Sequence, residues 1–540
     1  MKTFDRVGEV FQARGWLRIT AIFMMLMATS ACGPEISPQP YEAPPDAVSG
    51  SGRPIVFLTA AQMAEAIRMG RLTAVEVVEA HLKHIHQFNP KINAIVSIDE
   101  HAVRRQAREA DAALKQGDYR GPLHGVPVTV KDHFSVNGLR NTNGMPETAE
   151  YVPDSDASVV ARLKDAGAII LGKTNMPPMA MDMQTSNDIF GRTNNPWDLN
   201  RTPGGSTGGG AAAVAAGMSP LEIGSDIGGS IRQPSHFCGI YGFKATENTV
   251  SNHGSFVPLM EDFKSIRHMA SNGPLARSVA DLKLAYQLIA GPDGEDGMVI
   301  PPDESPLTKE SIADLRIAWT NQFGDVPVST DTKRVLREFV NKLSGRAGEI
   351  RHVSLSSIDF NRVWATWGEM MDLEVGVLQP PMTRFLIFLA GGAQRAKTPL
   401  LQMEYPAGYD DYIETVSRRD RITAQFDQLF LNWDVLICPV APMAAFAHHL
   451  PDDQKFGYNI YKKPLLVDGR AINYWTGCAS YTTPFNLTGH PVVVIPAGFS
   501  SEGVPIGLQL VAARGKDTAL LEMAEMIDRL AGDYRAPEGY

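Results

Sequence analysis

Two serines and one lysine are the residues of this sequence whose types and spacing could perform catalysis. Ser206 lies in Pro203-Gly-Gly-Ser-Thr-Gly-Gly-Gly210, Ser230 lies in Asp226-Ile-Gly-Gly-Ser-Ile-Arg232, and Lys131 stands 75 positions before Ser206. A serine hydroxyl is a weak nucleophile that must lose its proton as it attacks a carbonyl carbon. A lysine can take a proton only when it is neutral, and burial favours that form by lowering the pKa from about 10.4. These residue types would therefore allow a lysine-activated serine to attack a carbonyl group.

The glycine-rich stretch that contains Ser206 permits two other interpretations. A phosphate-binding P-loop requires GxxxxGK[ST], and no lysine follows these glycines, so that interpretation fails. The segment 204–208 does match the G-x-S-x-G nucleophile elbow, but that motif requires a strand directly before the serine. Residues 194–203 are polar and broken by proline, which argues against the elbow. Taken singly, a lysine at a strand end is usually solvated, and serines among glycines usually suit turns.

The order and spacing of several motifs carry more information than any one glycine loop. The two serines are 24 positions apart, the second lies inside Asp-x-Gly-Gly-Ser-x-Arg, and Lys131 ends a Gly-x-Pro-x-x-x-Lys-Asp segment. Together these motifs resemble the amidase signature family, and the similarity runs from about residue 55 to 535 and is strongest over 121–245. Three further motifs support it: Gly172-Lys-Thr-Asn-Met-Pro177, Phe190-Gly-Arg-Thr-Asn-Asn-Pro-Trp197 and Phe485-Asn-Leu-Thr-Gly-His-Pro-Val492.

The resemblance implies a Ser–cis-Ser–Lys triad and a reaction. Ser230 would be the nucleophile, Ser206 would follow a cis Gly205–Ser206 peptide and bridge to it, and Lys131 would be the base. The implied reaction is hydrolysis of a carboxylic amide to an acid plus an amine or ammonia through an acyl-enzyme, without metal or organic cofactor. The backbone N–H groups expected to form the oxyanion hole are those of Ile227, Gly228, Gly229 and Ser230.

One residue departs from the family pattern. The family usually has a second serine after the cis-serine, where this chain has Thr207. Because threonine keeps a hydroxyl group, we expect the triad to be retained. Asp226 and Arg232 are expected to brace the loop and not to touch the substrate.

Other residue types that could do chemistry have plainer interpretations. His81, His84 and His86 lie on one predicted helix, where only the first two share a face, and no acidic ligand completes a metal site. Four methionines are expected either to line an acyl pocket or to pack in the core, and the sequence does not decide between the two: Met176, Met179, Met181 and Met183.

The elements that must position these residues follow from capping and periodicity. Capping boxes at Thr59-Ala-Ala-Gln62 and Thr73-Ala-Val-Glu76 predict two helices, the first ending at Gly70 and the second at about His86. Lys131 is expected at the carboxyl end of a strand over 125–130. Strands alternating with helices predict an α/β fold, one large domain whose mixed β-sheet is covered by helices on both faces. Helices are expected at 156–166, 209–217, 278–291 and 517–531, and strands at 168–171, 435–437, 492–495 and 507–511.

The N-terminus is expected to be an export signal that precedes the fold. Four basic residues lead into an uncharged run over 19–31, which is too short for a comfortable transmembrane helix and suits a signal-peptide core. The run ends at Thr29-Ser-Ala-Cys32, which resembles a bacterial lipobox except that Thr29 replaces the usual leucine. Residues 1–31 are therefore predicted to be an export signal, 32–54 a proline-rich tether and 55–540 the amidase catalytic domain. We expect the protein in the bacterial cell envelope or periplasm, lipid-anchored at Cys32.

Composition and charge narrow the partners. Without residues 1–31 the chain carries 46 basic and 58 acidic residues, and no lysine or arginine cluster stands out, so nucleic acid is not an expected partner. The expected partner is a small-molecule or peptide amide. Cys238, Cys438 and Cys478 show no disulfide or metal spacing and are expected to be packed thiols.

Two alternative functions remain open from the sequence. One is the glutamine-hydrolysing subunit of a tRNA-dependent amidotransferase, which the export signal and the lack of basic clusters disfavour. The other is an exported binding protein that has lost activity, which the intact set of Lys131, Ser206 and Ser230 disfavours. The residues expected to select the substrate, over 300–430 and around 176–183, carry no readable code.

Overall fold

The structure is a computed structural model of the 540-residue chain. It divides into two units, Met1–Ala47 and Val48–Tyr540. The predicted export signal and the predicted tether up to residue 52 lie outside the described residues, so the domain boundaries stay predictions. The structure describes residues 53–259, 265–305, 307–376, 382, 384–385, 398–402, 407–455, 458–531 and 534–540.

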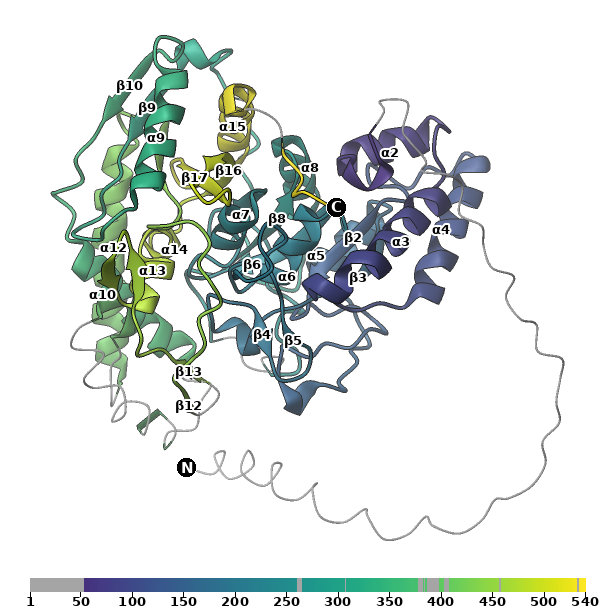
Figure 1. The fold of residues 1–540 in the computed structure, drawn as a ribbon, viewed down its shortest axis with the longest axis horizontal. Coiled ribbons are helices and arrows are strands. Elements are labelled where there is room, and N and C mark those ends of the chain that lie inside the picture. Colours follow the sequence, from purple (N-terminus) through teal and green to yellow (C-terminus); the bar gives the residue numbers. More distant parts are fainter. Residues whose placement is uncertain are drawn as a thin grey trace, which may run out of the picture. The chain divides into compact units, whose positions relative to one another are not determined.

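The second unit is built around one large sheet of eleven strands, which Figure 1 shows at its centre. Its order is β1-β3-β2-β6-β8-β7-β16-β17-β11-β9-β10. Pairs β2/β3, β2/β6, β9/β10 and β9/β11 are parallel and the other neighbours are antiparallel, so the sheet is mixed, as predicted. The strands of this sheet are β1 (Ile95–Ser97), β2 (Pro127–Lys131), β3 (Ile169–Thr174), β6 (Leu221–Asp226), β7 (Tyr241–Lys244), β8 (Ser271–Ala276), β9 (Arg316–Trp319), β10 (Glu349–His352), β11 (Val435–Pro439), β16 (Val492–Phe499) and β17 (Pro505–Val511).

Among the described residues, helices and three short hairpins surround this sheet. The hairpins are β4 (Ser186–Asn187) with β5 (Gly191–Arg192), β12 (Asp453–Lys455) with β13 (Tyr458–Ile460), and β14 (Leu465–Val467) with β15 (Arg470–Ile472). The α-helices are α2 (Ala60–Arg68), α3 (Ala74–Ile92), α4 (Glu100–Lys115), α5 (Ser158–Asp165), α6 (Gly208–Ala215), α7 (Arg232–Cys238), α8 (Val279–Ile289), α9 (Thr330–Leu343), α10 (Phe360–Glu374), α12 (Tyr409–Leu429), α13 (Tyr474–Ala479), α14 (Thr483–Leu487) and α15 (Asp517–Ala531). Short 3₁₀ turns are η1 (Ile55–Phe57), η2 (Pro146–Thr148), η3 (Pro178–Ala180), η4 (Ile312–Asp314) and η6 (Pro399–Leu401).

Helices cover both faces of the sheet, and strand β7 shows which helices lie on which face. Successive side chains of a strand point to opposite faces. Tyr241 hydrogen-bonds Asp528 of α15, and Phe243 packs edge-on against Tyr286 of α8, so α8 and α15 share one face. A Cβ on Gly242 would meet side chains of α7, so α7 lies on the other face. Helix α6 packs against α7 and against β6 on that second face.

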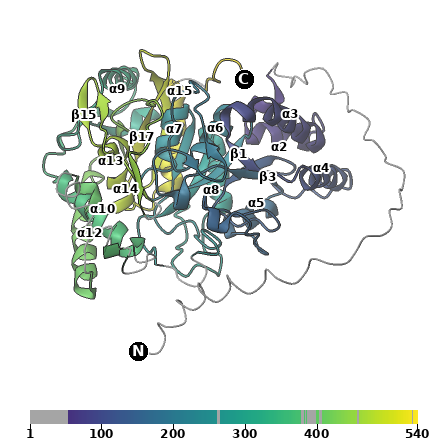
Figure 2. The same ribbon diagram turned by 60° about the horizontal axis from the view of Figure 1, so that its bottom comes forward.

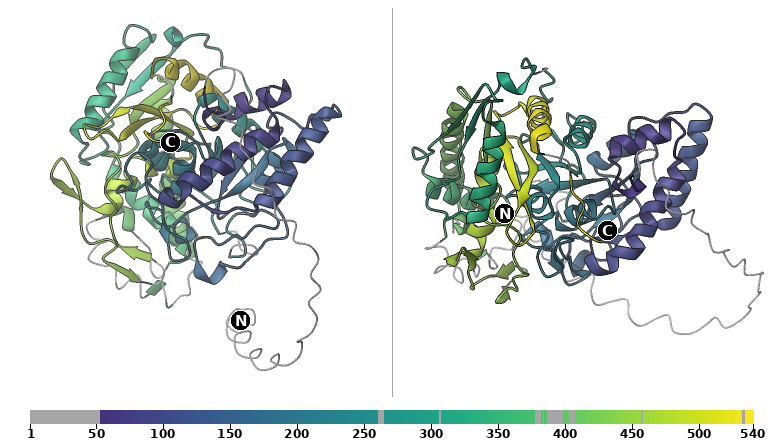
Figure 3. Two further views of the ribbon diagram at one scale, coloured as in Figure 1. Left: turned by 45° about the vertical axis from the view of Figure 1, so that its right-hand side comes forward. Right: turned by 45° about the horizontal axis from the view of Figure 1, so that its top comes forward.

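The core has two main parts, and the helices that cover each part can be followed in Figure 2. The larger cluster joins the N-terminal helices, the sheet, α8 and α15. In the second cluster, helices α10, α12, α13 and α14 pack against strands β11, β16 and β17. Figure 3 shows the C-terminal segment returning beside the N-terminal helices, where the ring of Tyr540 lies 4.9 Å from that of Phe88.

Most predicted elements are present, but three of them extend well beyond their predicted ends. Strand β3 runs to Thr174 where 171 was predicted, and β16 runs to Phe499 where 495 was predicted. Both capping boxes form, and Lys131 is the last residue of β2. The second helix does not end near His86 but continues through Pro90 to Ile92, where Asn93 adopts a left-handed conformation. Ile92 is fully buried, so tertiary packing holds this last turn. No helix among the described residues is long and apolar enough to cross a membrane.

Candidate active site

Lys131 lies where three parallel strands end. Strand β2 runs between β3 and β6, so the carboxyl ends of the three strands meet at one edge of the sheet. The Lys131 side chain is fully buried, and its Nζ lies 2.6 Å from the hydroxyl of Ser206 and 3.1 Å from that of Ser225. The structure thus brings together two of the three residues of the predicted triad.

Burial decides the charge of Lys131. Loss of solvation lowers the pKa of its amine from 10.5 to about 7, although the negative charges of Asp226 and Glu222 oppose this shift. At neutral pH a substantial fraction of this amine is therefore unprotonated. A neutral amine 2.6 Å from a serine hydroxyl can accept that hydroxyl's proton.

Ser206 follows a cis peptide bond. The Gly205–Ser206 bond is cis, which confirms what the family resemblance implied. Thr207 is the N-cap residue of α6, and its amide donates to the Ser230 carbonyl oxygen at 3.1 Å. This bond ties the loop that carries Ser206 to the loop that carries Ser230. The retained hydroxyl of Thr207 lies 3.4 Å from the Ser225 carbonyl oxygen.

Ser230 lies in the short loop between β6 and α7. Its side chain is nearly buried, and Ser206, Ser225 and Ser230 line one pocket. No strand leads directly into Ser206, since residues 193–207 form turns and isolated bridges. Strand β6, in contrast, ends four residues before Ser230. This arrangement agrees with the argument from sequence against an elbow at Ser206.

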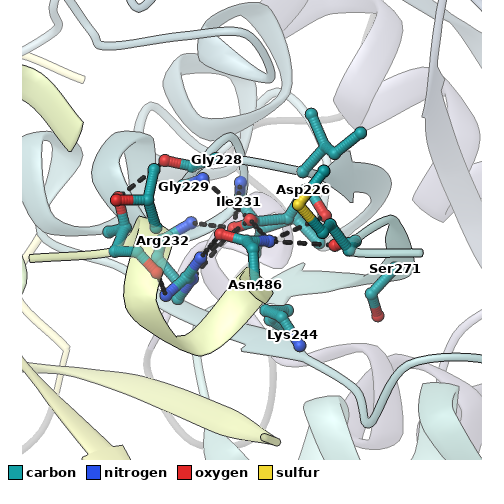
Figure 4. Close-up of polar contacts among 12 residues, drawn as sticks. Asp226, Gly228, Gly229, Ile231, Arg232, Lys244, Ser271 and Asn486 are labelled. Carbon is teal, nitrogen blue, oxygen red and sulfur yellow. Dashed lines mark hydrogen bonds and ion pairs between the residues drawn. The ribbon is translucent and has the colours of Figure 1, made fainter. Parts of the chain in front are cut away.

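A buried ion pair braces the Ser230 loop, as Figure 4 shows. Asp226 and Arg232 have fully buried side chains, and their charged atoms meet at 2.9 and 3.0 Å. Asp226 also accepts from the amides of Gly229, Ile231 and Arg232, and Arg232 donates to the Thr482 carbonyl oxygen. These contacts fix the backbone on both sides of Ser230, which agrees with the predicted bracing role.

The same contacts bear on the predicted oxyanion hole. The Gly229 amide donates to Asp226 Oδ1 at 2.8 Å, so it is already engaged, in conflict with its predicted role as a donor to the oxyanion. Gly229 has a φ of 124°, and a Cβ there would lie 2.5 Å from the Thr482 hydroxyl, which in turn donates to the Gly228 carbonyl oxygen. The loop is therefore fixed on both sides around Ser230.

Three residues of this site were not predicted from the sequence. The hydroxyl of Ser225 accepts a hydrogen bond from Lys131. The side-chain amide of Asn486 donates to Asp226 Oδ1 at 2.8 Å, and its oxygen accepts from Arg232. Thr482 donates from its hydroxyl to the Gly228 carbonyl oxygen and accepts a hydrogen bond from Arg232 with its own carbonyl oxygen. Asn486 falls inside the family motif over 485–492, and Ser225 falls inside Gly-Ser-Asp226, so the motifs contained a signal for these two but not for Thr482.

The pocket beside the serines is mostly apolar. The four methionines divide: Met179 and Met181 line the pocket, whereas Met176 and Met183 are buried away from it. Among the described lining residues, Asp226 carries a charge, and its ion pair with Arg232 neutralises that charge. The lining residues are Met179, Ala180, Met181, Ser206, Ser225, Asp226, Ile227, Ser230, Asn252, Phe256, Ile266, Ala270, Asn272, Met371 and Val375.

The histidines of α3 each contact a different partner. His81 lies 2.8 Å from the Val77 carbonyl oxygen, His84 lies 2.6 Å from that of Ala216, and His86 contacts Glu100. Within the described ranges no group of three metal-ligating side chains converges. All three predicted thiols, Cys238, Cys438 and Cys478, are free and buried.

The chain is similar to known proteins over most of its length. The family model described as Amidase matches residues 76–521. A glutamyl-tRNA(Gln) amidotransferase subunit from Roseiflexus castenholzii is 34% identical over 510 residues, which cover 90% of this chain and 98% of that protein. The corresponding protein of Carboxydothermus hydrogenoformans is 32% identical over 504 residues, with coverage of 89% and 99%.

Solved structures show the same architecture. A 6-aminohexanoate cyclic dimer hydrolase with bound substrate is 26% identical, with a TM-score of 0.73 and coverage of 89% of this chain and 99% of that one. A bacterial aryl acylamidase of the amidase signature family has a TM-score of 0.72 at 23% identity, with coverage of 88% and 96%. At that identity the aryl acylamidase supports the fold alone.

Proposed function

This chain belongs to the amidase signature family and hydrolyses carboxylic amide bonds, and we propose that Ser230 is its nucleophile, activated by Ser206 and Lys131. The observation that carries the proposal is the 2.6 Å contact between the buried Lys131 amine and the Ser206 hydroxyl. That hydroxyl shares a pocket with Ser230. A buried amine with a pKa of about 7 is the base that such a serine pair requires.

In the proposed reaction two linked proton transfers, from Ser230 to Ser206 and from Ser206 to Lys131, carry one proton equivalent from the nucleophile to the base. As Ser230 Oγ bonds to the amide carbon, its proton passes to Ser206 Oγ, and the Ser206 proton passes to Lys131 Nζ. Backbone N–H groups stabilise the resulting oxyanion, each by a factor of about 100 to 1000. Because Gly229 donates to Asp226, we assign this role to Ile227, Gly228 and Ser230. The proton returns through Ser206 to the departing amine, and water then hydrolyses the acyl-enzyme by the reverse path.

The pocket lining supports an amide with an apolar group as the substrate class. Most of its lining side chains are apolar, and among the described ones none carries an uncompensated charge. Asn252 and Asn272 provide a polar pair, in which the Asn272 amide donates to Asn252 Oδ1 at 3.1 Å. Buried apolar surface therefore supplies most of the binding energy that this pocket can offer.

A second candidate is the glutamine-hydrolysing subunit of an amidotransferase. The curated relatives described above carry the amidotransferase name and match over nearly their whole length. Free glutamine bears an ammonium and a carboxylate, and burying either one without a partner is costly. Since the described lining offers no free charge to pair with them, we favour an amidase that acts alone on apolar amides.

A panel of amides tests the substrate class. We expect kcat/KM to rise along a series of linear acyl amides by up to about fourfold per methylene, since each buried methylene contributes about 0.8 kcal/mol. Glutamine is expected to be a poor substrate. The Met371→Asn variant should lose activity on the longer amides more than on acetamide, whereas Met69→Asn, at an exposed methionine, should change neither. Glutamine as the best substrate, with activity that requires a co-purified tRNA-binding subunit, would instead support the second candidate.

We further propose that the protein is exported and lipid-anchored at Cys32. Support comes from the basic leader, the uncharged run over 19–31 and the small residues before Cys32. Expressed in a bacterium with an alkyne-tagged fatty acid, the wild type and Cys478→Ser should take up the tag, whereas Cys32→Ser should not. An untagged wild type whose mature chain lacks residues 1–31 would mean export without the anchor. A chain that retains these residues would contradict export.

A further inference from the structure

Glu222 is a carboxyl group buried beneath the active-site lysine. It lies on β6, where it pairs with Thr129 of β2, and it has no solvent exposure. Paired residues of neighbouring strands share a face, and so do Thr129 and Lys131, which are two positions apart. Helix α6 closes over this face so tightly that a Cβ on Gly210 would lie 2.5 Å from the Glu222 carboxyl carbon.

The carboxyl group of Glu222 reaches across strand β2. Its Oε1 accepts a 2.7 Å hydrogen bond from the hydroxyl of Thr174 on β3. Strand β2 lies between β6 and β3, and Thr174 is the residue of β3 that pairs with Lys131. The carboxyl group must therefore lie over β2 at the level of Lys131. Its second oxygen, Oε2, makes no hydrogen bond of good geometry with the described residues, although the hydroxyl of Thr129 lies close enough to favour the carboxylate.

We propose that Glu222 is a positioning residue that controls the charge of Lys131 and so sets the pH at which the amidase becomes active. When Glu222 is a carboxylate, it stabilises the ammonium form of Lys131, and an ammonium cannot accept a proton from Ser206. A neutral Glu222 removes that stabilisation and leaves Lys131 as the amine that accepts a proton from Ser206. This inference rests on the proposed role of Lys131 as the base.

The two groups titrate in one pH range. Burial raises the pKa of Glu222 to about 7 and lowers that of Lys131 to about 7, and each charge favours the other. An unpartnered carboxylate oxygen in a dry site is costly, which favours the neutral acid when the ammonium is absent.

The other charged or titratable groups around this pair do not take over its role. Asp226 is held as a carboxylate by Arg232, which keeps its pKa well below the usual range. Burial keeps the pKa of His133 well below its usual value, so that ring is neutral. Lys173 precedes Thr174 and so points to the other face of β3, where it lies 3.7 Å from the Asp132 carboxylate and donates to carbonyl oxygens of residues 132 and 134. Its positive charge also favours the Glu222 carboxylate, but Asp132 and carbonyl oxygens hold it away from the Lys131 amine. Helix α6 and strand β8 contribute no charged side chain.

The Glu222→Gln variant tests the inference because it keeps the shape and removes the charge. The acidic limb of its kcat/KM profile is expected to move about one pH unit lower, because an opposite charge nearby shifts a pKa by about one unit or more. One unit below the wild-type midpoint, activity relative to the plateau should then rise about fivefold. Thr174→Val removes a hydrogen bond that favours the Glu222 carboxylate, so the acidic limb of its kcat/KM profile should also move to lower pH. Asp281→Asn, at another fully buried carboxyl group, should leave the midpoint unchanged.

The outcomes separate this inference from the proposed function. If Lys131→Met keeps its activity, Lys131 is not the base and both proposals fail. If Lys131→Met is inactive while Glu222→Gln and Thr174→Val keep the wild-type midpoint, the charge-control role fails and the triad stands. A limb that moves to higher pH overturns the inference as well. Should Glu222→Gln not fold, the midpoint of Thr174→Val decides alone.

Discussion

Replacing Ser230 with alanine is expected to lower kcat/KM for amides by a factor on the order of 10⁶, the size of effect seen when a serine nucleophile is removed from another hydrolase. The physical reason is that alanine leaves no oxygen to bond to the amide carbon, while the Asp226–Arg232 brace around the loop remains. Labelling of the protein with a fluorophosphonate probe measures the same property directly. The wild type should take up one label, and Ser230→Ala should take up none.

Ser235→Ala provides the matched control for this result. Ser235 is a buried serine one turn into α7 whose hydroxyl donates to the Ile231 carbonyl oxygen, so its loss disturbs the same helix without touching the pocket lining. It should keep both label and activity. A label found on Ser206 would mean that the nucleophile has been misassigned. A wild type that takes up no label at all would favour the inactive binding protein considered from the sequence.

The positions of the three proposed catalytic residues could be predicted from the sequence because local signals determine them. Lys131 closes an apolar strand, and a strand of a parallel pair ends at the ligand-binding edge of its sheet. Ser206 and Ser230 lie in loops that the sequence marks with motifs, glycines around Ser206 and the Asp226 to Arg232 element around Ser230. The cis bond before Ser206 came from the family resemblance and not from the residues themselves.

What the sequence did not predict depends on pairing between distant segments. Strands β7 and β8 join the middle of the sheet although Ser271–Ala276 contains glycine, proline and asparagine, which are poor strand formers. Gly273 is required there because a side chain would collide with the Phe243 carbonyl oxygen. Strand register also brings Glu222 beneath Lys131, and chain folding brings Asn486 to Asp226 from 260 positions away. Spacing along the chain carries no information about either contact.

Replacing Lys131 with methionine is expected to lower kcat/KM by a factor of about 100 to 10,000, the usual contribution of a positioned general base. Methionine fills a similar volume but cannot take the proton from Ser206. In the proposed mechanism the base is the neutral Lys131 amine, whose pKa is about 7, so wild-type activity should fall about tenfold per pH unit below pH 7 and level off above it. The variant should lose this dependence, as a pH profile of kcat/KM will show.

Protein stability distinguishes loss of the base from loss of the fold. In the unfolded chain Lys131 is protonated below pH 10.5, whereas in the folded chain it resists protonation down to pH about 7. Between these values the unfolded state binds more protons, so this residue makes the protein less stable as the pH falls from 10.5 to 7. Lys131→Met removes this cost, and its melting temperature at pH 7 should exceed that of the wild type. A variant that is inactive and also less stable than the wild type at pH 7 would contradict the buried neutral amine on which the mechanism depends.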